Sequence, residues 1–141
     1  MEIKLQRIDN AYRMEASNDI GRTLETDGSE AIGGSNSAMR PMQVLLSAIG
    51  GCSSIDVISL LKKQKQPLED IKVIVTGDRE EGKVPSLFTS INIHYDLYGA
   101  IDPSRAEKAI SLSVEKYCSV SLMLRKETTV TWSYNIHPGL H

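Results

Sequence analysis

The longest apolar stretch of the sequence runs from Pro41 to about Lys65, and it constrains the fold more than any other feature. Proline is favoured at the first position of a helix, because its missing N–H would have no partner there. Pro67 ends the pattern, so the stretch predicts one helix of about 25 residues. Apolar residues surround most of its circumference, and we therefore expect a helix that is buried on every side.

The length of this helix has a consequence for assembly. A helix of about 25 residues is ~37 Å long, and a compact domain of 141 residues has a diameter of about 37 Å. One chain barely covers such a helix, so we infer a homodimer in which the partner covers part of it. Gly50 and Gly51 lie in the middle of the helix, where each costs ~1 kcal/mol relative to alanine. Their presence predicts the close approach of another backbone.

Shorter periodic segments flank the helix. Before it we expect three strands and a small polar loop, at Ile3–Ile8, Tyr12–Ala16, Arg22–Thr26 and Gly33–Arg40. After it we expect two strands, at Ile71–Val75 and Leu87–Leu97. A helix capped by Asp102 and a further helical segment after Cys118 follow, and the last strand lies at Val130–Ile136. This order predicts an α+β fold, with antiparallel sheets around a long central helix, in a single domain spanning residues 1–141.

Charge and composition exclude several classes of protein. The chain has 16 Lys and Arg residues against 18 Asp and Glu residues, which argues against binding to nucleic acid or to a membrane surface. No stretch has the ~18–20 consecutive apolar residues of a membrane span. The N-terminus carries no apolar signal core, so we expect a cytoplasmic protein. In that compartment two cysteines are more often free or redox-active than a structural disulfide.

Neither the glycines nor the histidines form a recognised binding motif. The glycine pairs lack the spacing of a phosphate loop or a dinucleotide fingerprint. The sequence has no CxxC or HExxH grouping, so we expect neither a metal nor a cofactor. His94 lies in a predicted strand and is interpreted as an ordinary strand residue, whereas His137 and His141 are interpreted as solvated residues of the tail.

The two cysteines are the remaining candidates for chemistry. Taken alone, each is more often a small buried hydrophobe than a nucleophile. Cys52, however, follows two glycines, which leave room beside its sulfur on the helix. Cys118 lies where a helical pattern breaks. If it begins the next helix, the free N–H groups there favour a thiolate.

Two motifs around these cysteines carry a family resemblance. The segment 41–57 (PMQVLLSAIGGCSSIDV) resembles the central-helix motif of the family of osmotically inducible protein C and organic hydroperoxide resistance proteins (OsmC/Ohr). The segment 112–120 (LSVEKYCSV) resembles the second-cysteine motif of that family. The motifs occur in the expected order, the resemblance covers nearly the whole chain, and it is closest to a less characterised OsmC-like branch.

The resemblance implies an intertwined α+β homodimer whose active sites lie at the subunit interface. It implies a thiol-dependent peroxidase that reduces organic hydroperoxides or hydrogen peroxide in the defence against oxidative stress. Cys52 would be the peroxidatic thiol and Cys118 the resolving thiol, and the two would form a disulfide. A dithiol reductant would then restore the thiols without a metal or an organic cofactor.

One position departs from the family pattern. Peroxidases of the family place a glutamate directly after the proline that starts the helix, where this chain has Met42 followed by Gln43. Arg22 and Arg40 are candidate cations for activating the thiolate, and Gln43 is a candidate supporting residue of the site. Asp56 follows Cys52 by four residues on the same helical face, where it either weakens the nucleophile or holds an arginine near it.

This departure keeps two alternatives to a peroxidase open. One is a non-enzymatic module that binds a small molecule near Cys52. The other is a redox sensor that forms the Cys52–Cys118 bridge with negligible turnover.

Overall fold

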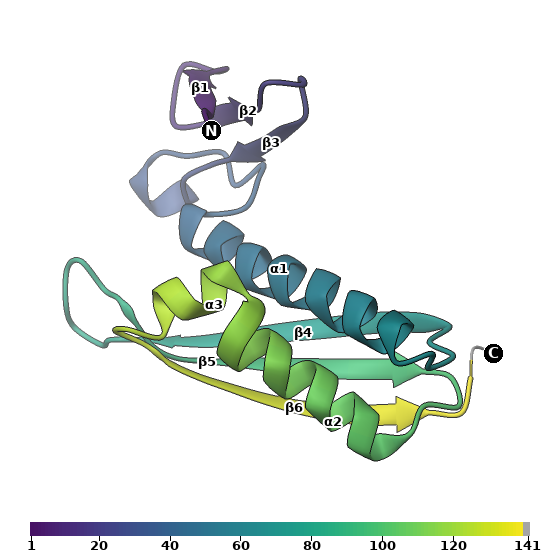
Figure 1. The fold of residues 1–141 in the computed structure, drawn as a ribbon. Coiled ribbons are helices and arrows are strands. Elements are labelled where there is room, and N and C mark those ends of the chain that lie inside the picture. Colours follow the sequence, from purple (N-terminus) through teal and green to yellow (C-terminus); the bar gives the residue numbers. More distant parts are fainter. Residues whose placement is uncertain (140–141) are drawn as a thin grey trace. The chain divides into compact units, whose positions relative to one another are not determined.

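The computed structural model describes residues 1–139, and His141 therefore lies outside the described residues. The chain forms two compact units, an N-terminal unit (Met1–Leu45) and a C-terminal unit that begins at Leu46. In chain order the elements are β1 (Lys4–Arg7), β2 (Met14–Ser17), β3 (Thr23–Thr26), the 3₁₀ turn η1 (Glu30–Ile32), α1 (Pro41–Lys63), β4 (Asp70–Arg79), β5 (Phe88–Tyr98), α2 (Pro103–Leu112), the π-helical turn η2 (Ser113–Tyr117), α3 (Ser119–Leu124) and β6 (Thr129–His137) (Figure 1).

The N-terminal unit is a sheet of three antiparallel strands in the order β1-β2-β3. Polar side chains fix both of its turns. The Asp9 carboxylate accepts hydrogen bonds from the N–H groups of Ala11 (2.8 Å) and Arg13 (3.1 Å). The Asn18 side chain accepts one from the N–H of Arg22 (2.9 Å). Such Asx turns allow two tight reversals in a short segment, as the sequence predicts.

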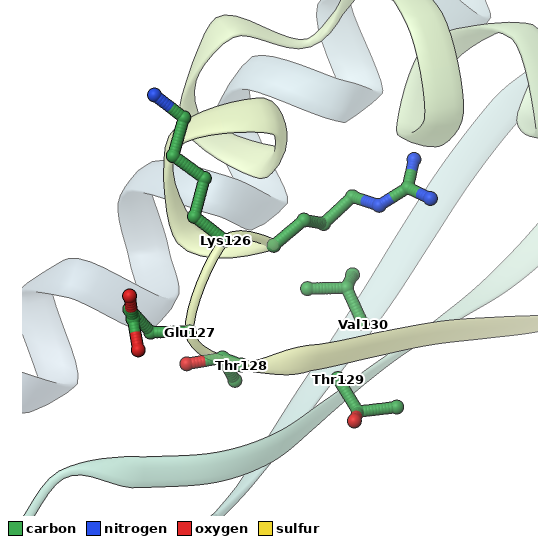
Figure 2. Close-up of a pocket in the computed structure, with 6 residues that line it drawn as sticks. Lys126, Glu127, Thr128, Thr129 and Val130 are labelled. Carbon is green, nitrogen blue, oxygen red and sulfur yellow. The ribbon is translucent and has the colours of Figure 1, made fainter.

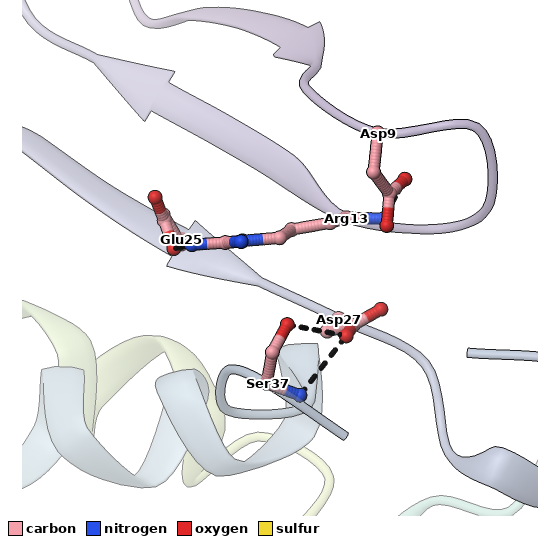
Figure 3. A network of polar contacts seen from close by, with 5 residues as sticks. All are labelled: Asp9, Arg13, Glu25, Asp27 and Ser37. Carbon is pink, nitrogen blue, oxygen red and sulfur yellow. Dashed lines mark hydrogen bonds and ion pairs between the residues drawn. The ribbon is translucent and has the colours of Figure 1, made fainter. Parts of the chain in front are cut away.

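A polar network holds the last strand of this sheet and the loop that follows it (Figure 3). The Nε atom of Arg13 on the β1–β2 turn donates to Glu25 of β3 at 3.0 Å. Asp27 is buried, and its carboxylate accepts from the Ser37 N–H (3.0 Å), the Ser37 hydroxyl (2.8 Å) and the Gly28 N–H (2.7 Å). These bonds hold the pKa of Asp27 below its ordinary value, and the bond from the Ser37 N–H is the largest cause.

The C-terminal unit contains a second sheet, in the order β4-β5-β6. β4 and β5 pair antiparallel, as expected, but β5 and β6 run parallel. The prediction of purely antiparallel sheets is therefore wrong at this pair. The reason is the connection, because α2, η2 and α3 form a crossover that returns the chain to the end of the sheet where β5 begins.

The core of the C-terminal unit lies between this sheet and the two helices α1 and α2, which cover one face of it (Figure 1). β5 contributes alternate side chains, and its fully buried residues are Ile91, Ile93, Tyr95 and Leu97. The predicted alternation fails at the start of the strand, where Leu87 is exposed and Phe88 is buried. There the pairs Asp78–Ser90 and Arg79–Phe88 leave Thr89 as an extra residue, and this bulge reverses the inward face.

α1 begins at Pro41 as predicted and ends at Lys63, and Lys65 has the left-handed backbone that terminates a helix. Only one face of α1 is buried within the chain, with Ile49, Gly50, Ser53, Val57 and Leu61 as its buried residues. Ile55 is 66% exposed and Ile58 is 41% exposed. The expectation of a helix buried on every side is thus not met by one chain.

The two glycines of α1 have different environments. A Cβ atom added at Gly50 would lie 2.8 Å from Cγ2 of Val75, whereas one added at Gly51 would meet no atom within 4 Å. Gly50 therefore permits a close approach, though it is made by a side chain of β4 rather than by the predicted backbone. Gly51 faces open space.

By length and composition alone, α1 would qualify as a membrane span, contrary to the expectation from the sequence. Within the chain, the buried face of α1 contacts β5. The hydroxyl of Tyr95 on β5 donates a 2.7 Å hydrogen bond to Ser53 Oγ, and both side chains are buried.

The face of the sheet opposite the helices carries a polar cluster that the sequence did not predict. Nε2 of His137 lies 2.8 Å from Asp96 Oδ1, and Nε2 of His94 lies 3.6 Å from the same oxygen. The ring of His137 also stacks on that of Tyr98. His137 is thus a strand residue with defined partners rather than a solvated tail residue, and its hydrogen bond lowers the pKa of Asp96.

Candidate functional site: two thiols and a carboxylate

α1 and the start of α3 supply the candidate site, which lies within the C-terminal unit. Cys52 and Asp56 are four residues apart on α1, so their side chains leave the same face of the helix, and both are half-buried. Cys118 is the N-cap residue of α3 and is fully buried. Its Sγ accepts a hydrogen bond from the Ser121 N–H at 3.4 Å, which confirms the prediction that Cys118 begins a helix.

The fold brings these three side chains together. The two Sγ atoms and a carboxylate oxygen of Asp56 all lie within 4.8 Å of one another. Both cysteines are free thiols in this structure. The sulfurs therefore meet within one chain, close enough for a modest rearrangement to join them, although their residues are distant in the sequence.

Buried hydroxyl groups surround the site and fix the backbone that carries it. The Ser113 hydroxyl lies 2.9 Å from the carbonyl oxygen of Ser53 and 3.4 Å from Oδ2 of Asp56, so it can donate to either. The Ser121 hydroxyl donates to the carbonyl of Val114 at 2.7 Å and ties η2 to α3. Together with the bond from Tyr95 to Ser53, these contacts hold the cysteine of α1 against the cap of α3.

The surroundings strongly favour the neutral form of Cys118. Burial is the main cause that raises the pKa of this thiol to about 11, and the neighbouring Cys52 and Asp56 act in the same direction. The hydrogen bond from the Ser121 N–H opposes the shift but does not cancel it. Burial likewise raises the pKa of Tyr95 to about 12. At neutral pH the buried sulfur is therefore a protonated thiol, and Cys52 is the more accessible of the two.

The other predicted site residues, Arg22, Arg40 and Gln43, belong to the N-terminal unit. Arg22 is exposed. The Arg40 guanidinium donates to the carbonyl of Ala38 (3.1 Å) and to the Asn36 side chain (2.6 Å). Gln43 Oε1 accepts from the N–H of Arg40 at 3.0 Å, which is half of a capping box at the start of α1. Gln43 thus has a structural role, and the activating role of either arginine stays a prediction.

Sequence reasoning missed Ser53, Tyr95, Ser113 and Ser121. Ser53 carries the only available signal, because it is a polar residue beside Cys52 in a strongly apolar helix. The other three are recognisable only once the fold shows which side chains meet.

A separate hollow of about 370 Å³ lies between the end of α3 and the start of β6 (Figure 2). Its lining residues are Arg125, Lys126, Glu127, Thr128, Thr129 and Val130. This hollow is open and mostly polar and contains no thiol, so we do not assign the chemistry to it.

Comparisons with known proteins agree with this architecture. The family model described as OsmC-like protein matches residues 34–133. Protein YhfA of Escherichia coli strain K12 is 41% identical over 117 residues, which are 82% of this chain and 84% of that protein. The crystal structure of a hypothetical protein from Aquifex aeolicus VF5 has a TM-score of 0.83 at 33% identity, covering 96% of this chain and 94% of that one.

A more distant structure shares the fold alone. The organic hydroperoxide resistance protein OsmC of Legionella pneumophila superposes with a TM-score of 0.71 at 18% identity, covering 96% of this chain and 97% of its own. The family match spans both cysteines and most of the chain. The protein therefore belongs to the OsmC-like family.

Proposed function

We propose that this protein is a thiol-dependent peroxidase that reduces organic hydroperoxides or hydrogen peroxide. The observation that carries the proposal is the meeting of a half-buried and a fully buried sulfur within 4.8 Å. Related support comes from proteins of the same fold that are named organic hydroperoxide resistance proteins, from Legionella pneumophila and Elizabethkingia anophelis.

In the first step the Cys52 thiolate attacks one oxygen of the peroxide. The S–O bond forms as the O–O bond breaks, and the departing alkoxide, or hydroxide from hydrogen peroxide, takes a proton from solvent and leaves as an alcohol or as water. Sulfur is oxidised by two electrons and becomes a sulfenic acid. Cys52 suits this role better than Cys118, because Cys118 is buried and its raised pKa keeps it protonated.

In the second step Cys118 attacks the sulfenic sulfur. The S–S bond forms and the S–O bond breaks, and the thiol proton and the hydroxyl leave together as water. We assign to Asp56 the role of carrying this proton, since its carboxylate lies within 4.8 Å of both sulfurs and 3.4 Å from the Ser113 hydroxyl. An external dithiol then reduces the bridge by exchange and restores both thiols.

Peroxide consumption with cumene hydroperoxide and dithiothreitol tests the proposal. We expect Cys52→Ser to reduce the rate to that of buffer, and Ser59→Ala, an exposed position on the same helix, to leave it unchanged. With excess peroxide and without dithiothreitol, Cys118→Ser should complete one turnover per chain and then accumulate sulfinic acid, detected by mass. A Cys52→Ser protein that consumes peroxide at the wild-type rate would rule out the assignment.

Met42 favours two other candidates, a redox sensor and a binding module, because it occupies the position where the family resemblance places an activating glutamate. A redox sensor would lose two hydrogens per chain on treatment with one equivalent of peroxide but would show negligible turnover with excess dithiothreitol. A binding module would form no bridge and would retain ligand binding in Cys52→Ser. The same assay and mass measurement therefore distinguish the three readings.

We further propose a homodimer in which a second copy covers the exposed face of α1. That face carries Ile55 and Ile58, and Gly51 on it leaves open space in which another helix fits closely. Light scattering on the eluted protein should give twice the chain mass of 15.6 kDa, and a monomer would exclude this assembly. A pair of reduced thiols that cycle with a dithiol also suits the cytoplasm, which we propose as the location.

A further inference from the structure

We infer that the reduced protein binds one zinc ion through the Sγ atoms of Cys52 and Cys118 and a carboxylate oxygen of Asp56. Ligand spacing along the sequence does not predict this site, because the three residues come from two helices that only the fold brings together. The binding goes beyond the proposed function, and it stands or falls without any turnover of peroxide.

The geometry fits a zinc ion after a small adjustment. Three atoms that lie within 4.8 Å of one another share a point no farther than about 2.8 Å from each of them. Zinc binds thiolate sulfur at about 2.3 Å and carboxylate oxygen at about 2.0–2.2 Å. Shifts of roughly half an ångström, within the reach of side-chain rotation, therefore complete three of the four positions of a tetrahedral site.

The donor set selects a thiophilic cation. Two thiolates with one carboxylate suit zinc and disfavour magnesium or calcium, which prefer oxygen ligands. A dication held by two thiolates and one carboxylate leaves a net charge of −1 at the site.

The surroundings support entry and orientation of the ion. Cys52 and Asp56 are half-buried, so an ion can reach them from solvent, whereas Cys118 closes the site from inside. The Ser113 hydroxyl lies 3.4 Å from Asp56 and can orient its carboxylate, as outer-shell partners do at zinc sites.

Zinc and oxidation therefore exclude each other at this site. A disulfide has no thiolate to offer, so oxidation of the pair expels the ion. Conversely, a thiolate bound to zinc is not free to attack a peroxide. Inhibition of peroxide consumption by zinc rests on the proposed function, whereas zinc binding itself does not.

Titration of the reduced, chelator-treated chain with zinc against a chromophoric chelator tests the binding. We expect one ion per chain, and a loss of affinity of at least about tenfold in each of Cys52→Ser, Cys118→Ser and Asp56→Asn, since even outer-shell changes cost about 10–100-fold. Cobalt(II) should give the intense visible bands of a tetrahedral site with sulfur ligands. Wild-type protein oxidised with diamide needs no substitution, and it should bind no ion.

Asp96→Asn is the matched control. It makes the same chemical change at a carboxylate outside the proposed site, which lies 2.8 Å from His137 and 3.6 Å from His94. We expect this variant to bind zinc like the wild type. Loss of binding in Asp96→Asn, or retention of binding in Cys52→Ser or in the oxidised protein, would overturn the inference.

The two proposals can fail separately. If Cys52→Ser still binds zinc but no longer consumes peroxide, the proposed metal site is wrong and the proposed peroxidase activity is supported. If zinc binding requires both cysteines but the protein shows no turnover, the metal site is supported and the peroxidase activity is wrong.

Discussion

The C-terminal unit buries a continuous apolar core between a sheet and two helices, whereas the N-terminal unit leaves its apolar side chains in contact with solvent. Among residues 1–45 Asp27 alone is buried, and Leu5, Ile20 and Ile32 are each more than half exposed. A three-stranded sheet without a covered apolar face is only marginally stable. The C-terminal unit is therefore stabilised by its own core. The N-terminal unit depends on turns and polar contacts, and on a covering surface that we expect from a second copy of the chain.

The largest expected effect comes from the core of the C-terminal unit. Ile93 is fully buried, so Ile93→Ala should lower the free energy of unfolding by about 2–5 kcal/mol at any protein concentration. Leu5→Ala removes an exposed side chain of β1 and should act mainly on association, raising the dimer dissociation constant. Urea unfolding at two protein concentrations separates the two behaviours. If both variants lost the same free energy of unfolding with the same dependence on protein concentration, the two units would not differ in how they are stabilised.

Alkaline pH should weaken the C-terminal unit through Cys118. Burial raises the pKa of this thiol to about 11, whereas an unfolded cysteine titrates near ~8.5. Between these values the unfolded chain releases a proton that the folded chain keeps, so stability falls as pH rises, by at most about 1.4 kcal/mol per pH unit. Urea unfolding of the reduced protein measures this slope. Cys118→Ser should flatten it, and an unchanged slope would contradict the burial of a neutral thiol.

The periodic parts of the C-terminal unit were predictable from the sequence. Pro41, the apolar run and Pro67 define α1, and the alternation from Ile91 to Leu97 defines the buried face of β5. The parallel pairing of β5 with β6 was not predictable, because alternation reveals which side chains face the core but not the direction of the neighbouring strand.

The residues of the candidate site were likewise predictable only in part. Helical spacing places Cys52 and Asp56 on one face of α1, but only the family resemblance pairs Cys118 with Cys52. The roles of Tyr95 and Ser113 depend on contacts between residues far apart in the chain, and these contacts leave no pattern in the sequence.

The two glycines of α1 offer a matched pair for the two faces of the helix. Alanine at position 50 would place its Cβ 2.8 Å from Val75, so Gly50→Ala should cost about 1 kcal/mol after the gain in helix propensity. Alanine at position 51 meets no atom of its own chain. Gly51→Ala should therefore raise the stability of the chain by up to about 1 kcal/mol and weaken the proposed dimer. Thermal unfolding and light scattering measure the two effects, and equal behaviour of both variants would show that the faces of α1 do not differ.

The smallest expected effect tests whether polar contacts stabilise the N-terminal unit. Ser37→Ala removes the hydroxyl that donates to Asp27 at 2.8 Å and should cost about 1 kcal/mol at neutral pH. Because the pKa of Asp27 is lowered in the folded chain, its contribution is present above about pH 4 and is lost as the pH falls and the carboxylate is protonated. The difference in the free energy of unfolding between wild type and Ser37→Ala should therefore shrink in acid.

Ser35→Ala, in the same loop, is the control and should show no such dependence on pH. A cost that stays constant from neutral to acidic pH would mean that the Ser37 hydroxyl acts through the loop backbone, not through the buried carboxylate, and the polar network would then contribute little to this unit.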